Sequence, residues 1–156
     1  MGRLSGECGG AVEYALSLKQ PWAALLVHGL KTIEVRRWPT VRRGRVLIHA
    51  ARVPDAREQA WALVPASLRT AAEAVGGIVG AAELVECLTY RDLPSFVADK
   101  ERHLNDDSWF EPPVLYGFRF ANVTTLPFRL YPGWMRFFPV TEGFTGRKAK
   151  KPGSRT

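Results

Sequence analysis

LSLKQPWAALLVHGLKTIEVRRW, residues 16–38, places a short apolar segment directly before a charged one. Pro21 suits the first position of a helix, where a missing N–H leaves no hydrogen bond unmade. Gly29 suits the left-handed residue that ends a helix. These signals predict a helix over residues 21–28. Helical spacing puts three apolar side chains on one face, which is therefore predicted to be buried: Trp22, Leu25 and Leu26.

After this helix the apolar period changes to two, which predicts a strand over residues 32–36. Ile33 and Val35 then point toward the core. The opposite face carries a row of polar side chains: Thr32, Glu34 and Arg36. The corner between helix and strand thus combines an apolar support with charged groups.

The spacing Gly29-x-Lys31-x-x-Glu34-x-Arg36 resembles the G-x-K-x-x-E-x-R motif of the ASCH (activating signal cointegrator homology) superfamily. Flanking residues are similar too, most of all to the coactivator domain that names the family: Leu16-Ser17, Gln20-Pro21-Trp22-Ala23 and Trp38. A weaker resemblance covers roughly residues 14–150. It implies a PUA-like α+β fold, a small mixed β-barrel with flanking helices, and RNA or other nucleic acids as ligands.

The remaining pattern fits such a barrel better than a parallel, doubly wound sheet, because several short strands are interrupted by only a few helices. Apolar alternation and turn residues predict strands over residues 14–18, 45–51, 78–90, 115–120 and 123–130. Helices are predicted over 55–63 and 68–75, a polar helical excursion over 91–107, and an exposed turn over 131–138.

A chain of 156 residues with 46% hydrophobic residues is long enough for one domain with a sizeable core. We expect a disordered leader over residues 1–12, the ASCH-like domain over 13–140 and a basic flexible tail over 141–156. The sequence has neither a long apolar span nor an apolar signal segment. We therefore expect a cytoplasmic protein without membrane contact. We also expect a monomer.

Positive charge is concentrated at the two ends of the chain, which has a formal net charge of +7. Residues 1–60 hold ten Lys/Arg against five Asp/Glu, and residues 113–156 hold eight against one. The segment between them is acidic. Such asymmetry is typical of a phosphate-binding surface, although solvated ends would give the same composition.

An arginine-rich stretch, RRWPTVRRGR, follows the predicted strand over residues 36–45. Its proline and glycine predict a loop with solvent-facing cations. Arginine pairs with phosphate and indole stacks on bases, so four side chains here are candidate ligand contacts: Arg37, Trp38, Arg42 and Arg43. Packing in the core is the alternative for Trp38.

His49 lies in the predicted strand 45–51 and is a candidate ligand-binding or acid–base residue, with a hydrogen-bonded core histidine as the alternative. Cys8 and Cys87 indicate neither a disulfide framework nor a metal site. We expect no cofactor. The titratable groups of the acidic excursion are interpreted as solvated surface charges: Glu101, His103 and Asp106.

As a binding site, Lys31 and Arg36 would hold phosphate while Glu34 accepts a hydrogen bond from a nucleotide amino or hydroxyl group. An indole would stack on the base: Trp22, Trp38 or Trp109. The alternative is a salt bridge that only fixes the corner. The binding hypothesis predicts that replacing Lys31 and Arg36 with alanine weakens binding and leaves thermal stability nearly intact.

An enzyme is the second hypothesis, with Lys31 and Glu34 as catalytic residues. Some ASCH proteins resemble acetylcytidine amidohydrolases that use a lysine, a threonine three residues later and a distant glutamate. Glu34 occupies the threonine position here, which disfavours that mechanism. Hydrolysis of RNA stays open, with Glu34 or His49 as base and Lys31 or Arg36 stabilising the phosphorane. A third hypothesis is a protein-interaction module, since the domain of greatest resemblance belongs to a transcription coactivator.

Overall fold

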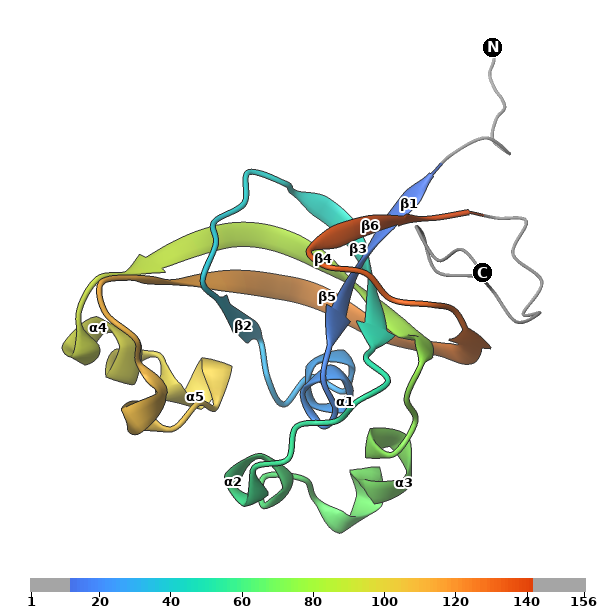
Figure 1. The fold of residues 1–156 in the computed structure, drawn as a ribbon, viewed down its shortest axis with the longest axis horizontal. Coiled ribbons are helices and arrows are strands. Elements are labelled where there is room, and N and C mark those ends of the chain that lie inside the picture. The colour runs from blue at the N-terminus through green and yellow to red at the C-terminus, as the bar shows by residue number, and fades with distance from the viewer. Residues whose placement is uncertain (1–11, 142–156) are drawn as a thin grey trace, which may run out of the picture.

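The structure, a computed structural model, describes residues 12–141. The predicted leader and tail lie outside these residues, except for their boundary positions 12 and 141. These residues form six strands and several short helices, and Figure 1 shows how they are arranged. The strands are β1 Glu13–Leu18, β2 Ile33–Arg36, β3 Gly44–Ala50, β4 Gly77–Tyr90, β5 Leu115–Leu130 and β6 Phe137–Val140. The helices are α1 Trp22–Val27, α2 Glu58–Trp61, α3 Arg69–Ala72, α4 Leu93–Ala98 and α5 Lys100–His103, with 3-10 turns η2 Ala66–Leu68 and η3 Asp107–Trp109.

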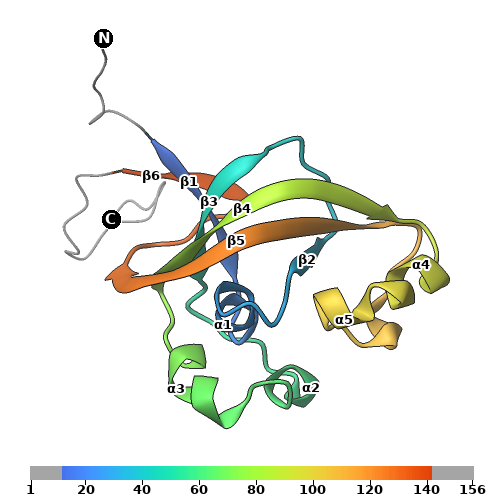
Figure 2. The ribbon, with the colours of Figure 1, turned by 180° about the vertical axis from the view of Figure 1, so that it is seen from behind.

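All six strands belong to one mixed sheet in the order β2-β5-β4-β3-β1-β6. β1 pairs with β3 in parallel, and the other neighbours are antiparallel. The long strands β4 and β5 arch over α1, so that the sheet forms a half-barrel around this helix (Figures 1 and 2). The predicted α+β class, a small mixed sheet curved into a half-barrel with flanking helices, is confirmed.

Helix α1 is buried all round, because each of its six residues lies in the core. Gly29 ends the helix with a left-handed φ of 86°, as the sequence predicts. The helix packs closely on the sheet at Gly80 of β4, where an added Cβ would lie 2.6 Å from the Val27 side chain. Residues 28–32, which connect α1 to β2, are thereby held against the sheet, and this fixes where β2 begins.

Two predicted strands, 115–120 and 123–130, are one continuous strand, β5. Asn122 has a positive φ of 52°, and the pairing with β4 shifts register next to it. A bulge of this kind absorbs an extra residue without ending the strand, so the prediction of two strands was wrong. The predicted turn over 131–138 was also too long, since Phe137–Val140 forms β6 and pairs with β1.

The helices outside the core are shorter than predicted. α2 spans four residues instead of the expected 55–63, and α3 covers only part of 68–75. The excursion 91–107 consists of α4 and α5, separated at Asp99, with η3 after them. Among residues 12–141, no helix has the length and apolar character needed to cross a membrane.

Candidate functional site

A cavity of about 670 Å³ opens where the helix-to-strand corner faces the loops after β3, after α5 and before β6. Its lining is rich in cations and indoles. Six cationic side chains contribute: Lys19, Lys31, Arg36, Arg37, Arg57 and Arg136. Two carboxylates, Glu34 and Asp55, oppose them. Three tryptophans complete the set: Trp22, Trp38 and Trp134. Positive charge beside flat aromatic surfaces is the chemistry that single-stranded nucleic acid requires.

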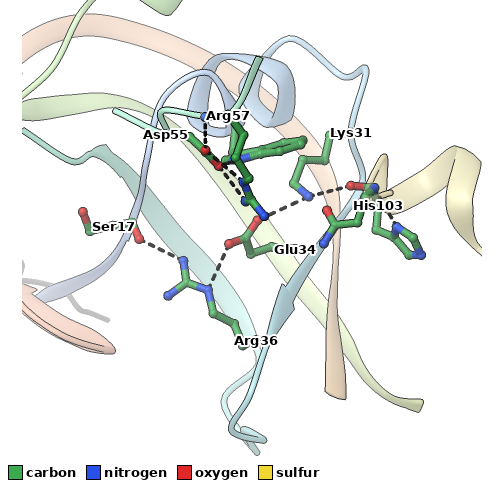
Figure 3. Close-up of polar contacts among 9 residues, drawn as sticks. Ser17, Lys31, Glu34, Arg36, Asp55, Arg57 and His103 are labelled. Carbon is green, nitrogen blue, oxygen red and sulfur yellow. Dashed lines mark hydrogen bonds and ion pairs between the residues drawn. The ribbon is translucent and has the colours of Figure 1, made fainter. Parts of the chain in front are cut away.

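Lys31, Glu34 and Arg36 form the more buried part of the cavity lining, which we call the floor. Glu34 is held there by a cation on each side (Figure 3). Its Oε1 lies 3.3 Å from Lys31 Nζ, and its Oε2 lies 3.0 Å from Arg36 Nε. Arg36 also donates from Nη2 to the carbonyl oxygen of Ser17 at 2.8 Å. The strand pattern predicted that Glu34 and Arg36 share a face, and their contact confirms it.

Lys31 is only 1% exposed although its side chain lines the cavity. Its ammonium donates to the carbonyl oxygen of His103 at 2.9 Å and lies 4.9 Å from the centroid of the Trp22 ring. Burial lowers the pKa of Lys31, and the neighbouring Glu34 carboxylate opposes that shift. Such burial makes Lys31 a structural group as well as a candidate contact, so its removal is now expected to lower stability.

Asp55 fixes the loop after β3. No sequence signal marked this role, because Asp55 was only the first residue of the helix predicted over 55–63. It accepts the Trp22 indole N–H at 2.8 Å and a pair of bonds from the Arg57 guanidinium at 2.7 and 3.0 Å. The hydrogen bonds from Arg57 hold the pKa of the Asp55 carboxyl well below its usual range. Arg57 in turn stacks 3.7 Å from the centroid of the Trp109 ring.

The rim of the cavity carries cations that are exposed. Lys19 forms no ion pair with any described residue, and Arg136 lies 4.8 Å from the centroid of the Trp38 ring. Arg136 has a left-handed φ of 57°, an uncommon conformation for a residue with a side chain. Met135 beside it is 85% exposed. Apolar and cationic groups therefore meet at the entrance.

Comparison with models of known protein families identifies the family of this chain. The model of the ASCH domain matches residues 16–137, most of the chain. The chain belongs to the ASCH family. This family has a PUA-like fold and is associated with RNA binding.

Relatives and solved structures agree with this assignment. The ASCH chain is 34% identical over 88 residues to human activating signal cointegrator 1 and 33% identical to the mouse protein, covering 51% of this chain but only 15% of theirs. The crystal structure of ASCH from Zymomonas mobilis superposes with a TM-score of 0.58 at 15% identity, covering 83% of this chain and 88% of that one. A point mutant of the same Zymomonas mobilis protein gives a TM-score of 0.58 at 17% identity, covering 83% and 91%. At such identities the structural likeness concerns the fold alone.

The cavity is lined by only some of the candidate residues that were predicted from the sequence. Trp22, Trp38 and Arg37 line it together with the charged floor, and Arg37 also pairs with Glu111 at 2.7 Å. Trp38 packs edge-on against Phe118, with 5.0 Å between ring centroids, and so belongs to both core and site. Trp109 is outside the lining and supports Trp22 from behind, with ring centroids 6.1 Å apart.

Arg42, Arg43 and His49 are not among the lining residues. Arg42 stacks 4.1 Å from the centroid of the Tyr14 ring, and Arg43 donates to carbonyl oxygens of its own loop. His49 is 2% exposed and bridges Ser17 Oγ at 2.9 Å and the carbonyl oxygen of Tyr131 at 2.7 Å. The structure thus gives His49 the partners of a hydrogen-bonded core histidine.

His103 is fully buried, which corrects its interpretation as a surface charge. Its Nε2 lies 2.7 Å from the carbonyl oxygen of Phe96, and its Nδ1 accepts the backbone N–H of Asn105 at 3.0 Å. Nε2 must therefore carry the proton. Burial lowers the pKa of His103. No sequence pattern marks this residue, because its ring partners lie within a short excursion that otherwise looks polar.

Proposed function

We propose that this ASCH domain binds single-stranded nucleic acid, RNA or single-stranded DNA, in the cavity beside β2. One observation carries the proposal: six cationic side chains, only two carboxylates and three indoles line a single cavity. Cations supply phosphate affinity through counterion release, and indoles supply stacking surfaces for bases. The cavity favours single strands because stacking within a duplex covers the faces of the bases and pairing occupies their Watson–Crick edges.

The contacts divide between rim and floor. Lys19 and Arg136 are exposed at the rim and are suited to phosphate groups. Trp38 and Trp134 offer aromatic surface to a base. Glu34 lies deeper and is the acceptor for base N–H groups. In this arrangement the sugar–phosphate backbone of the nucleic acid stays near solvent while one base enters the cavity.

The test is titration of labelled single-stranded RNA, single-stranded DNA and duplex DNA over a salt series. We expect the single strands to bind more tightly than the duplex. Changing Lys19 and Arg136 together to alanine should weaken RNA binding about tenfold and reduce the slope of log K against log salt by about 1.4, because two phosphate contacts are lost. The free energy of unfolding should fall by no more than about 1 kcal/mol, since both side chains are exposed and an exposed cation–π contact such as that of Arg136 with Trp38 is weak.

The matched control changes Arg69 and Arg91 to alanine, which removes the same charge from exposed positions outside the cavity lining. This variant should retain wild-type affinity and slope. Equal losses in the two double variants would mean that general basic charge, and not the cavity, holds the nucleic acid. That result would contradict the proposal.

A second candidate function, hydrolysis of RNA or of a modified nucleoside, is favoured by the buried amine of Lys31. Its lowered pKa and its 3.3 Å contact with Glu34 inside a cavity are typical of reactive groups. The bound RNA should therefore be examined for fragments on a gel. Fragments made by the wild type but not by Glu34→Gln would assign RNA hydrolysis to this site, and intact RNA would exclude it. Hydrolysis of a modified nucleoside leaves the backbone intact and is tested by chromatography of nucleosides incubated with the wild type and with Glu34→Gln.

A further inference from the structure

The Glu34 carboxylate is fixed in place before any ligand arrives. Lys31 lies 3.3 Å from one oxygen and Arg36 lies 3.0 Å from the other, and Arg36 is itself anchored on the carbonyl oxygen of Ser17. An ionised carboxylate has about four acceptor positions, so each oxygen keeps capacity for one further hydrogen bond. The Glu34 side chain is 12% exposed and lines the cavity, which leaves these positions accessible.

Polar groups along the floor follow the order donor, acceptor, acceptor, donor: Lys31 Nζ, Glu34 Oε1, Glu34 Oε2 and Arg36 Nε. The first three complement the Watson–Crick edge of guanine, which presents the O6 acceptor, the N1–H donor and the N2 amino donor. Uracil presents one donor between two acceptors, cytosine one donor beside two acceptors, and adenine one donor beside one acceptor. Only guanine places two adjacent N–H groups against a carboxylate.

A donor for O6 is available at the Lys31 end of the row. The ammonium has three N–H groups, of which two point to the His103 carbonyl oxygen and to Glu34. Asn105, two residues after His103, also lines the cavity, and its side-chain amide makes no hydrogen bond to any residue in the described range 12–141. The amide nitrogen of Asn105 is therefore free to donate to the same oxygen.

We propose that the cavity selects guanine in single-stranded nucleic acid. Glu34 accepts from N1–H and from the N2 amino group, and Lys31 with Asn105 faces O6. This inference rests on the proposed function, because it names the base that the same cavity takes. Phosphate contacts at the rim add affinity for every sequence, whereas the floor discriminates among bases.

The experiment uses the full chain and five labelled RNA pentamers, UUXUU, in which X is guanine, inosine, adenine, cytosine or uracil. Each pentamer contains at most one guanine, so the RNA does not self-associate as guanine-rich RNA does. Binding is followed by fluorescence anisotropy at physiological salt. We expect the guanine pentamer to bind most tightly. Inosine lacks only the N2 amino group and should bind about tenfold more weakly, as expected for one lost hydrogen bond to a charged group.

Glu34→Gln provides the second arm, because glutamine keeps the size of the side chain but replaces one acceptor with a donor. The guanine advantage should fall to within about threefold while binding of UUUUU persists. Glu86→Gln is the matched control: Glu86 pairs with Arg119 at 2.8 Å and does not line the cavity. It should retain the full guanine advantage.

The outcomes separate this inference from the proposed function. If all five pentamers bind the wild type within about twofold of one another, guanine selection is refuted and nucleic-acid binding stands. A guanine advantage that survives in folded Glu34→Gln also refutes it. Should no pentamer bind, the proposed function fails and the guanine inference fails with it.

Discussion

Two neighbouring basic segments, the corner at residues 31–36 and the arginine loop at residues 37–45, differ in where their cations lie. Lys31 and Arg36 converge on Glu34 in the cavity floor. Beyond Arg37, the cations lie elsewhere: Arg42 in the loop stacks on aromatic rings, and Arg45, at the start of β3, pairs with Glu13 at 2.6 Å. Density of positive charge in the sequence therefore does not locate the site. Strand pairing does, because it sets which side chains face the cavity.

Lys31→Met should have the largest effect on stability, because it leaves the His103 carbonyl oxygen and Glu34 without their buried donor. We expect the free energy of unfolding to fall by about 3 kcal/mol. Urea denaturation measures this. Lys100→Met is the control: Lys100 is half exposed and pairs with Asp107, so that change should stay within about 0.5 kcal/mol. Equal midpoints for both variants would show that the corner is not held by Lys31.

Asp55→Ala comes next, because it leaves the Trp22 indole N–H without its acceptor and frees Arg57. A loss of about 2 kcal/mol is expected from the unsatisfied buried donor. The comparison is Asp107→Ala, which removes an exposed carboxylate from the ion pair with Lys100. Urea denaturation measures both variants. If the two substitutions lower the free energy of unfolding equally, Asp55 does not organise the cavity wall.

Acidification should also lower the stability, by less than either of these substitutions, through the two buried histidines His49 and His103. Burial lowers the pKa of each below the ordinary value of 6.5, so the unfolded chain binds protons more readily than the folded one. Their contribution is therefore fully present above pH 6.5 and is lost as the pH falls below that value. Thermal unfolding between pH 7.5 and 5 measures the loss.

His28→Gln provides the control for this pH dependence, because His28 is exposed. The variant should keep the wild-type pH dependence between pH 7.5 and 5. His103→Gln should reduce it. A flat profile in the wild type would contradict the assignment of His49 and His103 as buried neutral groups.

Local signals explain what could be predicted from the sequence. The α1 corner depends on Pro21, Gly29 and a change of apolar period within a few residues, and the structure confirms its elements. The alternation that put Glu34 and Arg36 on one face holds for the same reason. The arginine loop was recognisable from its proline and glycine.

Long-range partners explain what could not be predicted. Asp55 serves the site through Trp22, 33 residues away, and nothing around Pro54 signals that contact. Strand β6 contains Pro139 and becomes a strand by pairing with β1 at the opposite end of the described chain. His103 looked like a surface charge because its excursion is polar, yet Phe96 stacks on its ring at 4.2 Å between centroids.

Arg43→Ala should have the smallest effect of these variants, and it directly tests the difference between the corner and the arginine loop. Arg43 is exposed, donates only to the carbonyl oxygens of Thr40 and Arg42 among the described residues, and is absent from the cavity lining. We expect RNA affinity to change by less than about twofold and the free energy of unfolding by less than about 0.5 kcal/mol. Anisotropy titration beside Arg136→Ala measures the difference. A loss of RNA affinity as large as that of Arg136→Ala would mean that the RNA extends beyond the cavity and contacts the arginine loop, because Arg43 does not line the cavity.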